Sequence, residues 1–343
     1  MSLAPANVDE LGELLRTRPG RLRLCGGGSR QQRLPPRGDA LELCCRRLDR
    51  IERIDAPDQT CTVEVGVPRA ALDEALHRLG LELPCPGGGT LGGLFAADDV
   101  GAASWGGPSP RTLLLGLDGL LADGTAFRSG ARVVKSVAGF DVHKLLVGSA
   151  GRLFVAARLH LRLKPRPRAE AWFRRDDLDG PAAAALFTTL CQQAIPPAAM
   201  QLRRTPRGVE LRGRLAGRAS TVRAAQQAFA LREAAADWLD HVAAPTAGEC
   251  LAGGARPSQA ADLLALLPPG SDFVMHGGGR FELDTDGPAT SDQLLHRLHA
   301  LGATACIVHG APARRGLGTP TDPGAARLAQ GLARALDPHG LLV

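Results

Sequence analysis

The chain has 343 residues, of which 44% are hydrophobic, 22% charged and 3% aromatic, with a formal net charge of +6 at pH 7. This apolar content can fill the cores of two domains, and it excludes a disordered or fibrous protein. The basic balance suits an anionic small molecule or an acidic protein partner, whereas the scarcity of aromatic residues argues against nucleic-acid binding. No apolar run reaches the length of a membrane span and the N-terminus does not resemble an export signal, which predicts a cytoplasmic protein.

The first part of the chain alternates short strands with helices. Apolar spacing predicts a helix over 8–16, and a second helix that begins at Pro68 and ends at Gly80. Period-two alternation predicts strands over 21–25, 41–43, 60–67, 81–85, 113–122 and 126–128. The eight cysteines have no CxxC spacing, so reduced thiols are expected and no metal site.

Two of these strands run directly into glycine-rich loops. The first loop reads Gly26-Gly27-Gly28-Ser29-Arg30, and the second reads Pro86-Gly87-Gly88-Gly89-Thr90-Leu91-Gly92-Gly93. Glycine permits positive φ and close approach, so successive backbone N–H groups can surround anionic oxygens such as those of a dinucleotide pyrophosphate. Neither loop matches the P-loop or the three-glycine Rossmann pattern. With 42 glycines in the chain, either loop alone could also arise by chance.

The stretch 132–167 combines a short helix with a long strand. Asp141 is expected to cap a helix with Val142, Leu145 and Leu146 on one face, and Gly148 to end it. The following strand alternates leucines with polar residues and ends at Pro165: Leu159, Leu161 and Leu163 on one side, and Arg158, His160, Arg162 and Lys164 on the other. All three lysines of the chain (135, 144 and 164) lie here, which indicates either a required ammonium group, most plausibly at Lys135, or chance clustering.

Beyond residue 168 the pattern is that of a separate α+β module with an antiparallel sheet. Helices are expected over 181–194, 220–239, 258–267 and 290–300, and strands over 169–175, 200–215 as a hairpin, 272–276, 280–284 and 305–309. The region through Pro245 and Gly254 is expected to be a loop. A last helix is expected over 323–336.

Three separated segments together resemble the FAD-binding domain of the vanillyl-alcohol oxidase and p-cresol methylhydroxylase superfamily (PCMH-type). More closely, they are similar to the FAD-binding subunits of three-subunit glycolate oxidases. The segments are the two glycine loops and Val133-Val134-Lys135-Ser136-Val137-Ala138-Gly139-Phe140-Asp141 with Lys144-Leu145-Leu146-Val147-Gly148-Ser149.

The resemblance implies an α+β fold and a domain plan. It predicts a PCMH-type domain over 1–168, with subdomains of about 1–67 and 68–168, an α+β cap over 169–320 and a C-terminal helical segment, 321–343, that returns to the first domain. It also implies FAD contacts from Gly26, Gly27, Gly28, Ser29, Arg30, Pro86, Gly87, Gly88, Gly89, Thr90, Leu91, Gly92, Gly93, Lys135, Ala138, Gly139, Asp141, Gly148, Ser149, Gly151 and Val155.

The sequence also departs from the family pattern. No histidine follows the first loop, so FAD is expected to be bound non-covalently. Arg152 and Phe154 stand where the family commonly has smaller residues, and the carboxylates of Asp98 and Asp99 near a pyrophosphate would repel it.

Oxidation of a 2-hydroxy acid needs a cation for the carboxylate and a base for the hydroxyl proton. The candidates for these roles and for stabilising reduced flavin are Lys135, His276, Arg280, His309 and Arg314. None has a diagnostic spacing, and strand-end histidines are often structural.

The resemblance implies the FAD-binding subunit of a complex that oxidises glycolate or D-lactate. Its partners would be a catalytic FAD subunit and an iron–sulfur subunit, and any contact with the inner face of the membrane would be peripheral and through them. Two alternatives stay open: an autonomous FAD-linked oxidase or dehydrogenase of a hydroxy acid or sugar, and a structural subunit without flavin.

Overall fold

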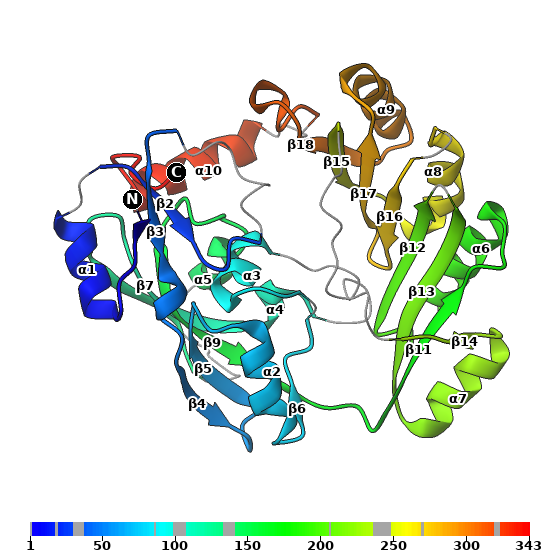
Figure 1. Ribbon diagram of the computed structural model, residues 1–343, viewed down its shortest axis with the longest axis horizontal. Coiled ribbons are helices and arrows are strands. Elements are labelled where there is room, and N and C mark those ends of the chain that lie inside the picture. The colour runs from blue at the N-terminus through cyan, green and yellow to red at the C-terminus, as the bar shows by residue number, and fades with distance from the viewer. Residues whose placement is uncertain are drawn as a thin grey trace. The chain divides into compact units, whose positions relative to one another are not determined.

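A computed structural model describes residues 2–17, 20–29, 38–85, 87–98, 108–132, 141–205, 207–235, 248–268, 271–318 and 323–343. The chain divides into two compact units (Figure 1). Unit 1 comprises Met1–Asp99, Ser109–Arg166 and Thr321–Val343, and unit 2 comprises Val100–Pro108 and Pro167–Pro320.

Unit 1 begins with a small parallel sheet. Its strands are β1 (Ser2–Leu3), β3 (Leu41–Cys44) and β2 (Leu22–Cys25), in that order. Helix α1 (Val8–Thr17) confirms the predicted helix: Leu11 and Leu15 are fully buried, and the Asn7 side chain accepts a hydrogen bond from the Glu10 amide at 2.9 Å.

The larger sheet of unit 1 is antiparallel and has five strands. Its order is β4 (Ile51–Asp55), β5 (Thr60–Glu64), β9 (Val155–Arg162), β7 (Leu114–Leu120) and β8 (Ala126–Gly130). Strands from both sides of the predicted subdomain boundary at residue 67 therefore share this sheet, because β5 pairs with β9. A hairpin turn at Asp123-Gly124 joins β7 to β8.

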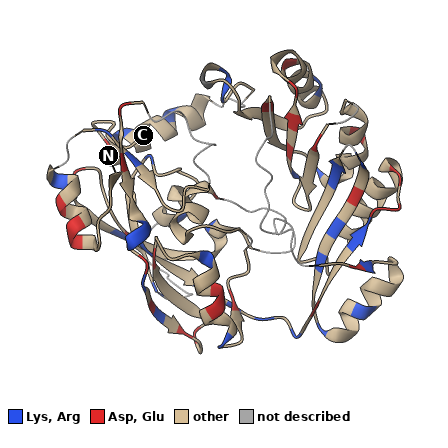
Figure 2. Ribbon diagram, viewed as in Figure 1, with Lys and Arg blue, Asp and Glu red and all other residues tan. Residues whose placement is uncertain are grey.

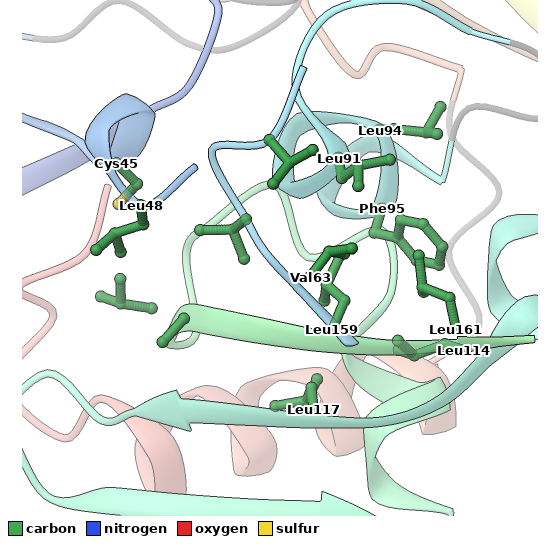
Figure 3. Close-up of a cluster of buried hydrophobic side chains, with 14 of the residues drawn as sticks. Cys45, Leu48, Val63, Leu91, Leu94, Phe95, Leu114, Leu117, Leu159 and Leu161 are labelled. Carbon is green, nitrogen blue, oxygen red and sulfur yellow. The ribbon is translucent and has the colours of Figure 1, made fainter. Parts of the chain in front are cut away.

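Short helices and a two-stranded ribbon complete unit 1. They are η2 (Cys45–Arg47), α2 (Arg69–His77), α3 (Leu91–Ala97), α4 (Pro110–Leu113), α5 (Val142–Leu146), α10 (Pro323–Leu336) and the pair β6 (Leu81–Glu82) with β10 (Lys164–Pro165). Side chains of α3 meet one face of the large sheet, where Leu91 and Phe95 lie near Val63, Leu159 and Leu161 (Figure 3). This contact fixes α3, and with it the end of the second glycine loop, on the core.

The alternation of β9 is confirmed on its apolar side, where Leu159 and Leu161 are buried. The expectation of a solvent-facing polar side is wrong at His160, which is only 5% exposed. Its Nδ1 lies 3.1 Å from Thr62 Oγ1 and its Nε2 lies 3.4 Å from Asp118 Oδ1. Because these cross-strand partners satisfy the imidazole, a polar side chain is tolerated within the fold.

Helix α5 is also oriented differently from the prediction. Its buried side chains are His143 and Leu146, whereas Val142 and Leu145 are exposed. Asp141 occupies the N-cap position without capping, because its carboxylate accepts from Lys144 Nζ at 2.5 Å instead. Gly148 has φ +86°, as expected for the residue that ends this segment.

Unit 2 is one antiparallel sheet of eight strands with its helices on a single face (Figure 1). The strand order is β14 (Arg232–Glu233), β11 (Ala169–Arg175), β13 (Gly208–Gly217), β12 (Ala199–Thr205), β16 (Phe273–His276), β17 (Arg280–Thr285), β15 (Glu249–Gly254) and β18 (Thr304–His309). The helices are α6 (Gly180–Cys191), α7 (Ala219–Ala228), η4 (Pro257–Gln259), α8 (Ala260–Leu266), α9 (Pro288–Ala300) and η5 (Pro312–Arg314). The predicted α+β fold with an antiparallel sheet is confirmed.

Two predictions within unit 2 are wrong. The helix expected over 220–239 ends at Ala228, because Ala230 has φ +48° and the chain then pairs with β11 as β14. The loop expected up to Gly254 contains strand β15, which pairs with β17 and β18. Its Gly253-Gly254 end has little strand propensity, so neighbouring strands decide its conformation.

Gly253 provides a test of this strand placement. A Cβ at Gly253 would lie 1.9 Å from the Thr304 carbonyl oxygen and 2.7 Å from Phe281 Cζ, whereas at Gly254 its nearest neighbour would be Thr304 Oγ1 at 3.4 Å. We therefore expect Gly253→Ala to lower the free energy of unfolding by about 1–3 kcal/mol in urea titration, and Gly254→Ala to change it far less. Equal effects of the two substitutions would contradict the register of β15.

Candidate functional site

The first glycine loop is an extension of strand β2. The strand leads directly into Gly26, and Gly28 adopts φ +80°, a conformation that favours glycine. The guanidinium of Arg46, on η2, donates to the Gly27 carbonyl at 3.1 Å. Arg30, the last predicted contact of this loop, lies outside the described residues.

The second glycine loop turns through two left-handed glycines and enters α3. Gly87 has φ +118° and Gly89 has φ +80°. Thr90 is the N-cap of α3, and its hydroxyl accepts from the Gly93 amide at 3.3 Å. Gly92 packs so tightly that an added Cβ would lie 2.9 Å from the Val65 carbonyl oxygen. Pro86 lies outside the described residues, and Leu91 is buried in the core.

The structure brings the two glycine loops into direct contact. A Cβ at Gly26 would lie 2.3 Å from Thr90 Oγ1, and one at Gly27 would lie 3.7 Å from the Thr90 amide nitrogen and 3.8 Å from Gly89 Cα. Glycine at these positions therefore permits an approach that a side chain would obstruct.

The third predicted segment contacts the elements that carry the two loops. The Gly148 amide donates to the Phe95 carbonyl at 3.1 Å, and the Ala150 amide donates to the Ala96 carbonyl at 2.9 Å, both at the end of α3. Gly151, with φ +75°, lies against Leu24 of β2, where an added Cβ would be 3.1 Å from the leucine side chain. Residues 148–151 thus lie against β2, which leads into the first loop, and against the end of α3, which begins in the second loop.

The other predicted residues of the third segment are either outside the described residues or make contacts that do not point to a ligand. Lys135, Ala138 and Gly139 lie outside the described residues. The Ser149 amide donates to the Leu146 carbonyl at 3.3 Å. Val155 is fully buried where β9 pairs with β7, so its side chain belongs to the core.

The carboxylate of Asp98 is paired with a cation. Arg111 Nη2 lies 3.3 Å from Asp98 Oδ2, and the same guanidinium donates to the carbonyls of Lys144 at 2.7 Å and Val147 at 3.0 Å. The expected repulsion of a pyrophosphate is therefore reduced at Asp98, and Arg111 ties the end of α3 to α5. Asp99 lies outside the described residues.

The loops fit an anionic dinucleotide. Among the described residues, the amides of Gly27, Gly28, Gly87 and Gly89 donate no hydrogen bond, and these glycines are exposed or half-buried. No atom lies within 4 Å of a Cβ added at Gly28 or Gly88, so a ligand can approach the backbone there. Exposed N–H groups in glycine-rich turns are donors for phosphate oxygens. This arrangement matches the chemistry of an FAD pyrophosphate.

The candidate substrate residues of unit 2 differ in their surroundings. Arg314 forms a bidentate ion pair with Glu249, in which Nε lies 2.6 Å from Oε1 and Nη2 lies 3.1 Å from Oε2. Its Nη2 also lies 2.8 Å from Asp292 Oδ1. A guanidinium engaged by two carboxylates is a poor receptor for a third, so Arg314 is better explained as a structural residue. His309 ends β18, where it pairs with Cys250.

His276 and Arg280 lie on the face of the unit 2 sheet opposite the one that packs against the helices of this unit (Figure 1). The pairs Val274–Glu282 and Met275–Phe281 place them opposite each other at the closed end of the β16–β17 hairpin. His276 is 4% exposed, and its Nδ1 lies 3.5 Å from Gln201 Nε2. Among the described residues, the Arg280 side chain has no hydrogen-bond or ion-pair partner. Figure 2 shows further basic residues along β11, β12 and β13.

Sequence reasoning missed three arginines that hold the candidate segments: Arg46, Arg69 and Arg111. Each donates to backbone carbonyls in or beside one of them. The chain holds 38 arginines, and no spacing distinguishes these three. Only the fold identifies them.

The described residues have two further properties. In those parts of the chain, no cluster of three His, Cys, Asp or Glu side chains could hold a metal ion. None of the helices described is long and apolar enough to cross a membrane.

Comparisons with known proteins agree with this geometry. Residues 2–130 match the family described as FAD binding domain. The chain is 36% identical over 148 residues to the glycolate oxidase subunit GlcE of Escherichia coli, covering 41% of each chain. It is 27% identical over 215 residues to the glycolate oxidase subunit GlcD of Bacillus subtilis, and 29% identical over 177 residues to a D-lactate dehydrogenase of Archaeoglobus fulgidus. These last two matches cover 58% and 48% of this chain and 44% and 38% of the relatives.

The chain therefore matches less than half the length of each of these relatives. A solved structure of alkyldihydroxyacetonephosphate synthase aligns over 99% of this chain and 75% of its own, with a TM-score of 0.73 and 13% sequence identity. This similarity shows a shared fold.

Gly88 offers a test of ligand binding that leaves the fold intact. Because a Cβ at Gly88 meets no protein atom within 4 Å, we expect Gly88→Ala to preserve thermal stability. The added methyl group would occupy the space open to a ligand, so FAD affinity measured by quenching of flavin fluorescence should fall at least tenfold. Gly331→Ala, in the exposed helix α10, is the matched control and should leave the affinity unchanged. Unaltered FAD affinity in Gly88→Ala would show that the second loop is not part of the site.

The Glu249–Arg314 pair predicts a pH dependence of stability. The bidentate contact with Arg314 holds the pKa of Glu249 below its ordinary value of 4.5, although burial opposes this. The stabilisation is therefore complete above about pH 4.5 and is lost as the pH falls through the lower pKa of the folded state. Melting temperatures from pH 7 to pH 3 should fall more steeply for the wild type than for Glu249→Gln, while Glu13→Gln, at an exposed position, should follow the wild type. Parallel curves for wild type and Glu249→Gln would contradict the pairing.

Proposed function

We propose that this protein takes part in the flavin-dependent oxidation of a small 2-hydroxy acid. The starting point is the match of residues 2–130 to the FAD binding domain family. The observation that carries the proposal is the direct contact of the two glycine loops in unit 1, with residues 148–151 against β2 and α3, the elements that carry these loops. The similarity to glycolate oxidase subunits and to a D-lactate dehydrogenase supports glycolate or D-lactate as the substrate.

The glycine loops would hold the cofactor through its pyrophosphate. Amides of Gly27, Gly28, Gly87 and Gly89 are the proposed donors to the phosphate oxygens. No histidine stands in the first loop, which supports non-covalent binding. Bound flavin would supply the two-electron acceptor for oxidation of an alcohol. Lys135 stays the proposed cation beside it.

Unit 2 would supply the groups that recognise a hydroxy acid. Arg280 is the favoured ligand for the substrate carboxylate because, unlike Arg314, it is not engaged by a described carboxylate. His276, opposite it, is the proposed base for the hydroxyl proton. The side-chain amide nitrogen of Gln201 lies 3.5 Å from Nδ1 and helps to orient the imidazole ring.

The chain is proposed to work as a subunit. Two of its relatives are named as glycolate oxidase subunits, which supports assembly with other subunits. The proposed partners are a catalytic FAD subunit and an iron–sulfur subunit, to which the electrons would pass. The D-lactate dehydrogenase relative favours a second candidate, an enzyme that oxidises its substrate without partners.

The visible spectrum of the purified protein, recorded without oxygen before and after addition of glycolate or D-lactate, tests the proposal. Bound flavin that bleaches with the chain alone supports the autonomous enzyme. Bound flavin that bleaches only after partner subunits are added supports the subunit. Flavin that stays oxidised in the complete assembly with both acids contradicts the proposed substrates.

Substitution of Arg280 tests the carboxylate site separately. We expect Arg280→Gln to raise the substrate concentration for half-maximal flavin reduction at least tenfold, because the bidentate cation is lost. FAD affinity should be unchanged. Arg218→Gln, at an exposed position of the same unit, is the control. Unaltered substrate dependence in Arg280→Gln would assign the carboxylate to another residue.

A further inference from the structure

We infer that Arg69 is the positioning residue of the second glycine loop, setting the backbone geometry in which residues 87–93 receive the FAD pyrophosphate. The inference rests on the proposed function and extends it to a residue that touches no part of the expected ligand.

The guanidinium of Arg69 connects helix α2 to the residues that follow strand β6 and precede the second glycine loop. Its Nε lies 2.9 Å from each carboxylate oxygen of Asp73, one helical turn further on. Its Nη2 donates to the Leu83 carbonyl at 2.9 Å, and its Nη1 donates to the Cys85 carbonyl at 2.5 Å. One planar group therefore holds two backbone carbonyls, two residues apart, shortly before the glycines.

The backbone of Arg69 holds the other side of the same loop. Its amide donates to the Gly89 carbonyl at 2.8 Å, next to a bridge between Pro68 and Thr90. The segment from Leu83 to Gly89 is thus fastened at both ends by a single residue. Between these points Gly87 takes a left-handed conformation that the loop sequence alone does not select over alternatives.

The effect of Arg69 extends to the first loop. Gly89 and Thr90 are the residues that contact Gly27 and Gly26. If the second loop shifts, the spacing between the two sets of amides changes with it. Two donors to one pyrophosphate must keep their separation to act together, so a loss of position becomes a loss of affinity.

Burial and charge make this role specific to arginine. The Arg69 side chain is 13% exposed, and Asp73 supplies the neutralising charge that a buried guanidinium needs. A lysine could pair with Asp73, but its single ammonium cannot reach the aspartate and two carbonyls in a fixed plane. The shape of the fork, as well as its charge, is therefore required.

Helix α2 contains a matched control for this interaction. Glu74 and Arg78 also form an ion pair at i,i+4 spacing, but their side chains are 69% and 74% exposed. Arg78 makes no described contact with the glycine loop. Comparison of the two arginines separates the general effect of a helix ion pair from the hold on the loop.

The test measures FAD dissociation constants, by quenching of flavin fluorescence on the cofactor-free full chain, for wild type, Arg69→Lys, Arg78→Lys and Asp73→Asn. Amide hydrogen exchange of Leu91, Gly92 and Gly93, whose amides donate hydrogen bonds at the end of the loop, is followed in parallel without FAD. We expect Arg69→Lys to weaken FAD binding at least tenfold and to speed exchange in the loop at least tenfold. Asp73→Asn should show smaller changes of the same sign, and Arg78→Lys should match the wild type.

The outcomes separate positioning from mere stability. Folded Arg69→Lys that binds FAD as tightly as the wild type, with unaltered loop exchange, overturns the inference. If Arg69→Lys does not fold, Asp73→Asn decides: wild-type affinity and exchange in that variant also overturn it. A wild-type chain that binds no FAD contradicts the proposed function, and loop exchange then still decides whether Arg69 holds the loop.

Discussion

The contact between Gly26 and Thr90 is the constraint on which the candidate site depends. Residues more than sixty positions apart approach so closely that a Cβ at Gly26 would lie 2.3 Å from the threonine hydroxyl oxygen. That hydroxyl also caps α3, whose far end accepts hydrogen bonds from Gly148 and Ala150. One close approach therefore aligns the two glycine loops, and α3 carries the alignment to the third segment.

Much of the positive charge of the chain is used inside the fold. Arg69 and Arg111 donate to backbone carbonyls beside the glycine loops and α5, and Arg314 is engaged by two carboxylates. Arg50 likewise pairs with the buried carboxylate of Glu64. Burial alone would raise the pKa of Glu64, but the contacts with Arg50 outweigh burial, so the pKa is lowered overall. The net charge of +6 is consequently a weak guide to ligands, and each cation has to be considered with its partners.

The sequence predicted elements with strong local signals. Helix 8–16, the strand carrying Leu159 and Leu161, and the left-handed Gly148 follow from periodicity and glycine stereochemistry. Features that depend on tertiary contact were predicted wrongly or not at all. Strand β15 forms because two neighbours pair with it, His160 is buried because Thr62 and Asp118 satisfy it, and α5 buries His143 in place of Val142. The candidate loops were visible as glycine runs, but the arginines that hold them carry no sequence signal.

The central claim is that these three segments together form an FAD site. Isothermal titration of the cofactor-free full chain with FAD, followed by precipitation with acid, tests it most directly. We predict one FAD per chain, with all of the flavin released into the acid supernatant because the binding is non-covalent. Absence of saturable binding, or flavin that stays with the precipitated protein, would contradict it.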